Sequence, residues 1–490
     1  MKQLQFDFNN MLSLNVGAKH GITDSELRHV AKKVREAHIH LQNIVASPEN
    51  RAHLGLEWIV LPRQEEKAIR RIQRLGREIS RGYENVIFLG IGGSFLGLKA
   101  AQDALCAPYY NDFAGIRQGK PRIYFEGNNL DPEPLNTLLG SLNPKRTFVI
   151  VISKSGETTE TRAAFTMVEQ WLKKGVGARY GRQIVAITDP VAGSLRKRVT
   201  EEQRKDTKSF RSLPVIKGVG GRYSEFNMGL LHLAIIGVDL TGVLKGAQLM
   251  VRRCTAASLY KNPAYLYAAL QYLAYQKKGK SIAILMPFSE TLKSTADWYV
   301  QLLAESLGKK YGRRIVRYSG NLERWDQDRD TVVNVGRTPV SARGTNDLHS
   351  IQQNTIEGEN NKTVTFIRVG RFRHDITLPP TGDFLSGRSY ARLLGLAQEA
   401  TEWALTRERR PSCTIYVPEV TPFYWAQLLM FFEIATALEG ELLGVNAFDQ
   451  PGVEGYKQYM YYILKKPGIP QRIARDIQSH PVRKKAGFIV

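Results

Sequence analysis

The sequence predicts an α/β protein with two parallel sheets, each flanked by helices. Short runs of β-branched and aromatic residues alternate with helical patterns in two separate parts of the chain, and this alternation is typical of parallel sheets covered on both faces. A length of 490 residues is also too great for one ordinary core. We therefore expect two lobes of similar architecture.

Each lobe is predicted from four short apolar runs. In the first lobe we expect strands at residues 85–90, 122–127, 147–153 and 183–189, with helices after residues 94, 131, 158 and 193. The second lobe repeats this rhythm, with strands expected at residues 281–287, 314–319, 363–369 and 413–419.

A polar and charged segment at residues 195–211 separates the two groups of strands. Such a composition is typical of an exposed connection or hinge, so we place the lobe boundary there. The chain before about residue 60 and after about residue 420 has helical patterns. The predicted organisation is an N-terminal helical segment, two α/β domains and a C-terminal helical segment, at residues 1–60, 61–200, 201–420 and 421–490.

The composition indicates a soluble globular protein of a reducing compartment. Hydrophobic residues make up 43% and charged residues 23% of the chain. The cysteines are odd in number and scattered, without a C-x-x-C pair, and the opening MKQLQFDFNN lacks the pattern of an export signal. The apolar runs are shorter than the roughly 18 residues of a membrane-spanning helix. We expect a cytoplasmic location and no membrane association.

The formal net charge of +23 could indicate nucleic acid, a membrane or a small anion as partner. Basic residues are dispersed along the chain, usually with acids close by, and aromatic residues do not interleave with them. We interpret most of this charge as solvated surface and expect no nucleic-acid partner. The charge favours association with a small dianionic ligand.

A glycine-rich turn follows the first expected strand. Gly92, Gly93 and Ser94 lie between that strand and a helix, where backbone amides can approach a phosphate or carbohydrate oxygen. The turn is not a dinucleotide fingerprint, because Phe95 replaces the third glycine, and it is not a Walker A loop, because Leu98 replaces the lysine. The alternative is a merely structural turn.

A second loop, SKSGETT, follows the strand expected at residues 147–153 and precedes a helix. Ser153, Lys154, Ser155 and Thr158 bring hydroxyls and an ammonium to the start of that helix. Together with the helix amides they can bind a phosphate dianion without a metal. The alternative is an ordinary serine or threonine N-cap beside a solvated lysine.

These loops and two longer motifs resemble those of the phosphoglucose isomerase family. The longer motifs are VGGRYSEFNMG at residues 219–229 and FDQPGVEGYKQYM at residues 448–460, and all four occur in the family's order. The resemblance covers about residues 80–465 and is greater to the shorter bacterial branch. It implies two sugar-isomerase (SIS) domains and the interconversion of D-glucose 6-phosphate and D-fructose 6-phosphate, a step of glycolysis and gluconeogenesis. No nicotinamide or metal cofactor is expected.

Two charged residues are expected at the centre of the chemistry. Arg222 follows two glycines and stays cationic at any working pH, so it suits a charge stabiliser better than a base. Glu305 lies in a helical stretch, four residues after Gln301 and on the same face. By resemblance, Glu305 moves a proton between C2 and C1 and Arg222 stabilises the enediolate. The alternatives are a structural Arg222 pairing with Glu225 and a solvated surface Glu305.

Two further residues are expected to open the sugar ring. His349 lies in GTNDLHSIQQNTIEG, where Thr345, Asn346 or Asp347 can cap a helix ending near Gly358, and a histidine in its first turn should stay neutral. Lys457 follows a proline and a glycine at an expected helix start. By resemblance both assist ring opening. Taken alone, the histidine could be structural and the lysine solvated.

The resemblance also implies the remaining site residues and the assembly. Members are usually homodimers in which one subunit contributes a histidine to its neighbour's site, so His349 is expected to act in the neighbouring subunit. The charged segment 309–344 lacks a secure counterpart and is expected to be a surface insertion. The expected substrate-binding residues are Gly93, Ser94, Ser153, Lys154, Ser155, Thr158, Gly221, Gln301 and Gln450.

Two rival functions share these residues. An isomerase that also accepts mannose 6-phosphate, or one acting on an aminosugar phosphate, could use the same phosphate-binding loop and base. A non-catalytic sugar-phosphate sensor would bind ligand through the same domains and nucleic acid through a basic surface. The presence of Glu305, Arg222, His349 and Lys457 together argues against a sensor, and no helix-turn-helix pattern is evident.

Overall fold

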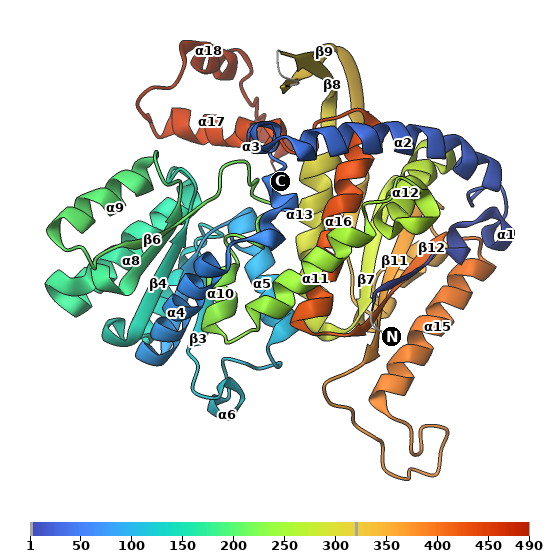
Figure 1. Ribbon diagram of the computed structural model, residues 1–490, viewed down its shortest axis with the longest axis horizontal. Helices are drawn as coiled ribbons and strands as arrows, with labels where there is room; N and C mark the ends of the chain where they lie inside the picture. Colours follow the sequence, from blue (N-terminus) through green and yellow to red (C-terminus); the bar gives the residue numbers. More distant parts are fainter. Residues whose placement is uncertain (1–2, 319–321, 490) are drawn as a thin grey trace. The chain divides into compact units, whose positions relative to one another are not determined.

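The computed structural model of the chain describes residues 3–318 and 322–489. The chain forms two compact units, Met1–Ala447 and Phe448–Val490. Within the described residues of the first unit, the strands form two largely parallel sheets and one hairpin, as Figure 1 shows. The predicted α/β class with two sheets is therefore confirmed.

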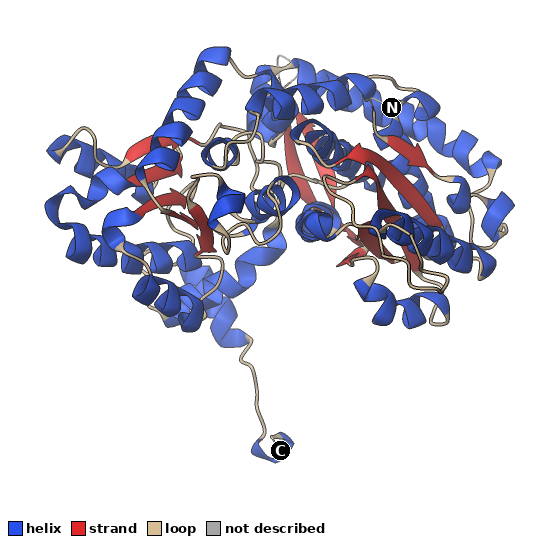
Figure 2. Cartoon of the chain, turned by 90° about the horizontal axis from the view of Figure 1, so that it is seen from below, coloured by secondary structure: helices blue, strands red, loops and turns tan. Residues whose placement is uncertain are grey.

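The first sheet is parallel throughout, and helices lie on both of its faces in Figure 1 and Figure 2. Its central strands are buried along their whole length, as expected for a sheet covered on both sides. In spatial order the strands are β3 (Arg122–Glu126), β2 (Asn85–Leu89), β4 (Thr147–Ile152), β5 (Ile184–Thr188) and β6 (Arg211–Pro214). The accompanying helices are α4 (Glu66–Gly82), α5 (Leu96–Leu105), α6 (Ala114–Arg117), α7 (Pro132–Ser141), α8 (Thr159–Val176) and α9 (Ser194–Lys205).

The expectation of a linker at residues 195–211 was wrong. Most of this segment is helix α9, and it ends at strand β6, which pairs in parallel with β5. Leu195 and Val199 are buried on the inner face of α9, while the numerous charges of the segment lie mainly on its outer face. The polar composition therefore reflected one exposed helix face and not a hinge.

The second sheet is parallel except for its N-terminal edge strand. Three of its predicted strands are confirmed, and β1 adds an antiparallel edge beside β12. In spatial order the strands are β1 (Gln5–Asp7), β12 (Ser412–Glu419), β11 (Lys362–Arg371), β7 (Ile282–Phe288) and β10 (Thr338–Ser341).

The strand expected at residues 314–319 does not belong to this sheet. It is part of β8 (Lys309–Arg317), which pairs antiparallel with β9 (Glu323–Val335) in a hairpin, and Ser319 lies outside the described residues. On the side of β7 opposite β11, the strand that pairs in parallel with β7 is the short β10. Exposed and covered residues mix along β8, as is usual in a ribbon with one solvated face. The segment expected to be a surface insertion is thus a hairpin followed by an edge strand.

The chain ends are mainly helical, as predicted, although the N-terminal segment also supplies β1. Helix α2 begins with a capping box in which Thr23 and Glu26 exchange hydrogen bonds. Helix α16 is buried on nearly all sides and packs against α11, α12 and α13. The remaining helices are α1 (Ser13–Val16), α2 (Asp24–Ala46), α3 (Pro48–Leu54), α10 (Leu230–Ile235), α11 (Leu240–Arg253), α12 (Pro263–Lys278), α13 (Lys293–Leu307), α14 (Gln352–Ile356), α15 (Tyr390–Arg407), α16 (Pro422–Leu443), α17 (Glu454–Ile463) and α18 (Gln471–Ser479).

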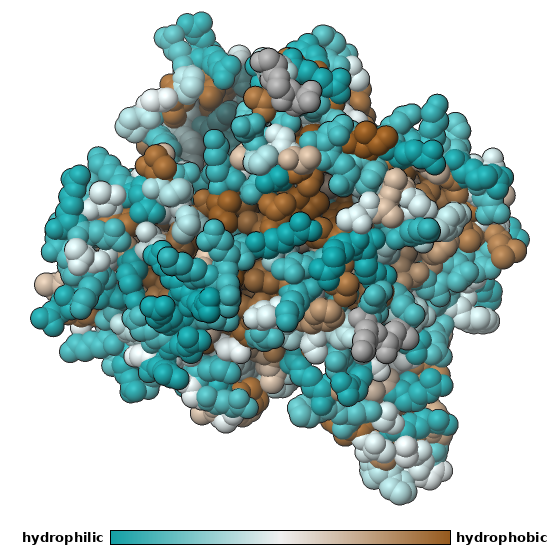
Figure 3. All heavy atoms as spheres, in the orientation of Figure 1, coloured by the Kyte–Doolittle hydropathy of each residue, from teal (hydrophilic) through white to brown (hydrophobic). Residues whose placement is uncertain are grey.

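The contact between α5 and α13 positions the candidate site. Helix α5 follows the glycine turn after β2, and α13 follows β7 of the second sheet, so their packing joins elements of both sheets. Among the described helices, none has the length and apolar character needed to cross a membrane. Hydrophilic side chains cover most of the face seen in Figure 3, and apolar ones gather towards its middle.

Candidate active site

Glu305 lies near the end of α13, as the helical pattern predicted, and both of its oxygens have partners. Gln301 Nε2, one turn earlier, donates to Oε1 at 3.2 Å. Arg222 Nη1 donates to Oε2 at 3.3 Å. The Glu305 side chain is 28% exposed and that of Arg222 only 2%. The carboxylate is therefore reachable from solvent while its buried cation is not, which suits a group that exchanges protons with a bound ligand.

The Arg222 guanidinium is held in place by neutral groups as well. Its Nε donates to Ser306 Oγ at 2.8 Å, and its Nη2 donates to the carbonyl oxygen of Ala447 at 2.7 Å. The Tyr223 hydroxyl lies 3.1 Å from the same Ser306 oxygen. Among the described contacts, the carboxylate that Arg222 meets is that of Glu305. Ser306, which immediately follows the proposed base, was the functional neighbour that the sequence did not single out.

Glu225 instead belongs to a separate cluster of buried side chains. Its Oε1 accepts from Trp298 Nε1 at 2.7 Å, and its Oε2 accepts from the backbone N–H of Ser224 at 2.9 Å. Burial raises the pKa of Glu225 above its ordinary value. Burial also raises the pKa of Glu433, and the neighbouring Glu225 carboxylate raises it further. Two carboxyl groups so close in an apolar interior favour a shared proton over two charges.

Two glycine-containing loops approach each other beside the pair of Arg222 and Glu305. A Cβ atom on Gly93 would lie 1.3 Å from the carbonyl oxygen of Gly221, so no larger residue fits there. Ser224 Oγ lies within hydrogen-bond distance of both carbonyl oxygens, 3.1 Å from Gly93 and 2.8 Å from Gly221. The neighbouring Gly92 lies close to α13, since a Cβ on Gly92 would meet Gln301 Nε2 at 2.8 Å. The glycines are required for close packing around the site.

The SKSGETT loop has the hydroxyl-lined form that the sequence predicted. Ser153 Oγ accepts from the backbone N–H of Gly156 at 3.0 Å, and Ser155 Oγ accepts from that of Glu157 at 3.1 Å. Thr158 occupies the N-cap position of α8 but makes no capping hydrogen bond with its side chain. The side-chain N-cap of the alternative is therefore not formed, whereas Lys154 is exposed, as that alternative held.

The loop leaves several groups available for an anion. Lys154 and Ser155 are exposed, and the first-turn amides of α8 point out of the helix start, where they favour negative charge. A cavity of about 200 Å³ borders the loop at Ser153 and Gly156 and continues between α8 and α9. Ser94, from the other glycine-rich turn, makes a 3.7 Å contact from its Oγ to Met228 Sδ.

His349 is placed differently from the prediction. A short 3-10 helix, Asn346–His349, and helix α14 replace the single capped helix that was expected to end near Gly358. Thr345 makes no side-chain capping bond, and His349 falls in the last turn instead of the first. The imidazole is exposed and makes no hydrogen bond to a described residue.

Gln450 and Lys457 lie in the second unit, Phe448–Val490. Gln450 precedes a short 3-10 helix, Pro451–Val453, and Lys457 lies in α17, so the predicted helix start is confirmed. Lys457 Nζ donates to Glu454 Oε1 at 2.9 Å. Burial lowers the pKa of Lys457, but the bond to Glu454 outweighs burial and raises that pKa above its ordinary value. The lysine is therefore cationic at neutral pH.

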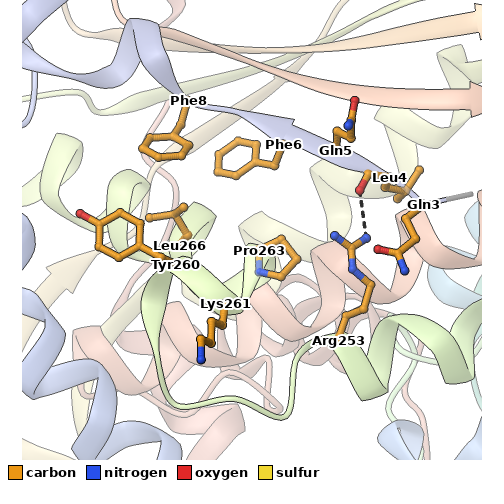
Figure 4. Close-up of a pocket in the computed structure, with 10 residues that line it drawn as sticks. All are labelled: Gln3, Leu4, Gln5, Phe6, Phe8, Arg253, Tyr260, Lys261, Pro263 and Leu266. Atoms are coloured by element: carbon orange, nitrogen blue, oxygen red, sulfur yellow. Dashed lines mark hydrogen bonds between the residues drawn. The ribbon is translucent and has the colours of Figure 1, made fainter. Parts of the chain in front are cut away.

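A cavity of about 680 Å³ lies elsewhere in the first unit, as Figure 4 shows. It runs beside β1 and the segment after α11, where Arg253 Nη1 donates to the carbonyl oxygen of Leu4 at 2.9 Å. None of the predicted site residues lines it. Its described lining is Gln3, Leu4, Gln5, Phe6, Phe8, Arg253, Tyr260, Lys261, Pro263 and Leu266.

The fold and the site define a class of protein before any comparison. A partly exposed carboxylate held by a buried guanidinium beside glycine turns is suited to proton transfer, and the hydroxyl-lined helix start after β4 is suited to binding a small anionic substrate. The family described as phosphoglucose isomerase matches residues 67–371 and 398–480. The chain belongs to the phosphoglucose isomerase family.

Individual relatives agree with this assignment. A glucose-6-phosphate isomerase of Carboxydothermus hydrogenoformans is 36% identical over 494 residues, covering 99% of each chain. That of Symbiobacterium thermophilum is 36% identical over 425 residues, covering 85% of this chain and 88% of its own. Among solved structures, a hypothetical protein of Thermus thermophilus is 29% identical with a TM-score of 0.79, covering 94% of this chain and all of that one (100%).

Proposed function

We propose that the protein interconverts D-glucose 6-phosphate and D-fructose 6-phosphate, with Glu305 as the base and Arg222 as the charge stabiliser. The observation that carries this proposal is the contact between the Glu305 carboxylate and the buried Arg222 guanidinium. Membership of the family and relatives named glucose-6-phosphate isomerase at 31–36% identity support the substrate pair.

Phosphate capture is the first step. The Ser153–Thr158 loop offers hydroxyls, the exposed Lys154 and the amides at the start of α8 to the phosphate dianion. Ser94 with Gly93 and Gly221, and Gln301 with Gln450, would bind the sugar and its phosphate. Because the phosphate does not react, its binding orients C1 and C2 and lowers the entropic part of the barrier.

Ring opening follows. His349 gives a proton to the ring oxygen as the bond from that oxygen to C1 breaks, and the C1 hydroxyl passes its proton to solvent water, from which the imidazole is reprotonated, to leave a carbonyl at C1. Lys457 remains cationic because Glu454 raises its pKa, so it suits a stabiliser of the sugar oxygens and not a base. A neutral imidazole is the better proton carrier near neutral pH.

Isomerisation then moves the proton on C2 to C1. The Glu305 carboxylate takes the proton from C2, the C2–H electrons form a C1–C2 double bond, and the electrons of the C1 carbonyl move to its oxygen, which gives a cis-enediolate. Arg222 stabilises the negative charge that develops on this oxygen. Glu305 then returns the proton to C1, and the C2 hydroxyl proton passes to the C1 oxygen, so that C2 becomes the carbonyl carbon of the ketose.

The assembly is part of the proposal. His349 is exposed, which makes its imidazole accessible to another chain. We infer a homodimer in which His349 serves the site of the neighbouring subunit. The three cysteines are all free and buried, which supports the proposed cytoplasmic location.

The test is conversion of fructose 6-phosphate to glucose 6-phosphate by the purified protein, coupled to a dehydrogenase. Glu305→Gln should lower kcat by about 10²–10⁴-fold because the amide cannot accept the proton, while sugar-phosphate binding by calorimetry persists. Glu290→Gln is the matched control, since Glu290 is 70% exposed and, among the described residues, pairs with Arg343. Full activity in Glu305→Gln would exclude it as the base. Turnover of mannose 6-phosphate at a similar rate would favour the broader isomerase.

A further inference from the structure

Basic side chains from four separate segments gather at the amino ends of strands β7, β11 and β12. Lys280 precedes β7, Lys362 opens β11, and Arg410 precedes β12. Lys19 and His20 come from the loop after α1, which lies on the same side of the molecule as β12 in Figure 1. We call these residues, together with Arg409, the basic cluster. None of its segments contributes a residue to the candidate active site.

Two of the three lysines of the basic cluster, Lys280 and Lys362, are buried without a carboxylate partner among the described residues. Lys280 is 0% exposed, and its Nζ donates to the side-chain oxygen of Asn360 at 2.6 Å. Lys362 is 9% exposed, and its Nζ donates to the carbonyl oxygen of Glu359 at 2.8 Å and to Asn361 Oδ1 at 3.0 Å. Neutral oxygens thus solvate both ammonium groups but leave their charges uncompensated.

Arg410 has unused hydrogen-bond donors at the centre of the cluster. Its Nε and Nη1 are buried and make no hydrogen bond to a described residue. The hydroxyl of Ser412, the first residue of β12 and two residues after Arg410, is likewise buried without a partner among the described residues. Buried polar groups in folded proteins are nearly always hydrogen-bonded, so this concentration of unpartnered donors needs an explanation.

The charges of the cluster repel one another. Burial, followed by Arg410, Lys362 and Lys19, lowers the pKa of Lys280 to about 8. Burial and then Arg410 lower the pKa of Lys362, and Glu359 opposes this shift. Burial and the neighbouring cations also lower the pKa of His20. A chain gains nothing from collecting like charges in this way unless an anion compensates them.

We propose that the basic cluster is a binding site for one small tetrahedral dianion, such as inorganic phosphate or a compact phosphate monoester. The guanidinium of Arg410 offers parallel N–H donors that match phosphate oxygens, Lys280 and Lys362 supply charge, and the Ser412 hydroxyl supplies a further donor. The anion would satisfy the unpartnered donors and remove the repulsion at once. The site is separate from the SKSGETT loop, and the proposal does not depend on the isomerase reaction.

The experiment follows thermal unfolding of the full chain with inorganic phosphate, at an ionic strength held constant with sodium chloride. Phosphate is also expected to bind the proposed catalytic site. All proteins in the experiment therefore carry Ser155→Ala and Thr158→Ala, which weaken phosphate binding by the SKSGETT loop. At about tenfold excess over Kd, phosphate should raise Tm by roughly 2 °C. Arg410→Gln should abolish this increase. The matched control is Arg407→Gln, since Arg407 is exposed and pairs with Glu408.

A second readout separates anion binding from simple packing. Without phosphate, Arg410→Gln should unfold at the same or a higher temperature than its parent, because the substitution relieves repulsion on Lys280 and Lys362. Lys362→Gln should reduce the response to phosphate as well, which keeps the test informative if Arg410→Gln does not fold. Glycerol 2-phosphate replaces inorganic phosphate in a parallel series, and a response to it identifies a monoester as an acceptable ligand. Two results would overturn the proposal. One is a saturable increase in Tm with either anion that is equal in the parent and in Arg410→Gln. The other is an increase in Tm with phosphate no larger than that with sodium chloride at the same ionic strength.

Discussion

The Glu305 carboxylate lies 3.3 Å from the Arg222 guanidinium, although 83 residues separate them in the chain. The arginine also donates hydrogen bonds to Ser306 Oγ and to the carbonyl oxygen of Ala447. These bonds keep its charge in place when the carboxylate takes up a proton. A stabiliser held in this way needs little reorganisation when negative charge develops on a substrate oxygen.

Arg222→Lys should lower kcat by about 10²–10³-fold, with a smaller change in KM, because a single ammonium cannot keep the contacts to Ser306, Ala447 and the carboxylate together. Steady-state kinetics with fructose 6-phosphate measure both constants. Ser306→Ala is the control, since it keeps the guanidinium and removes only the hydroxyl that contacts Arg222 Nε and Tyr223 Oη, so kcat should fall less than in Arg222→Lys. Wild-type kcat in Arg222→Lys would contradict the proposed role.

Gly93→Ala should prevent correct folding or destabilise the protein by about 3 kcal/mol or more, because its Cβ would overlap the carbonyl oxygen of Gly221. Gly220→Ala is the matched control: a Cβ there meets no atom within 4 Å, and its effect should stay within about 0.5 kcal/mol. Chemical denaturation of both variants measures the difference. Equal stability of the two would show that the glycine loops do not pack as described.

Mixing two inactive variants tests whether His349 acts in the neighbouring subunit. In a heterodimer of Glu305→Gln and His349→Ala subunits, one of the two sites would combine an intact Glu305 with an intact His349. Random subunit exchange should then restore about a quarter of wild-type activity. The same mixture stays inactive if His349 serves its own subunit. Fully active monomers in sedimentation at assay concentration would also exclude the arrangement.

His40 should make stability depend on pH near neutrality. Its imidazole bridges Glu441 at 2.7 Å and Glu323 at 2.9 Å, and Arg313 also pairs with Glu441. Burial lowers the pKa of His40, but the bonds to the two carboxylates outweigh burial and Arg313 and leave that pKa raised. The folded state therefore binds the proton more tightly than the unfolded chain does.

The bonds of protonated His40 to the two carboxylates stabilise the folded state fully below the pKa of an unfolded histidine, about 6.5. This stabilisation is lost as pH rises through the raised pKa of His40 in the folded state. The stability difference between wild type and His40→Gln should therefore be larger at pH of about 6 than at about 9. Urea unfolding at both values measures it. His29→Gln, on the same helix, is the control. A difference that grows with pH would contradict the assignment.

The sequence was a good guide wherever a local pattern coincided with burial. Strands β2, β4 and β7 are largely apolar and buried, and their patterns marked them correctly. Local pattern failed where only one side of an element is buried. The outer charges of α9 resembled a linker, and the half-exposed β8 resembled a strand of the parallel sheet.

The sequence indicated which residues form the candidate active site, but it did not predict how they are arranged. Motifs indicated Glu305, Arg222 and the SKSGETT loop, and the helical repeat correctly placed Gln301 beside Glu305. No local pattern predicted that Ser306 would hold Arg222, or that the helix around His349 would be broken into two short turns. These features depend on contacts between segments far apart in the chain.

By itself, the sequence determined the α/β class, most buried strands, the family and the chemical groups available for catalysis, because all of these follow from composition, motifs and local periodicity. The tertiary structure alone decided that Glu305 would meet Arg222, that Gly93 would touch Gly221, and that unpaired cations would converge around Arg410. The physical reason is that packing between sheets and helices sets distances across the core, and such distances leave no trace in the local order of residues.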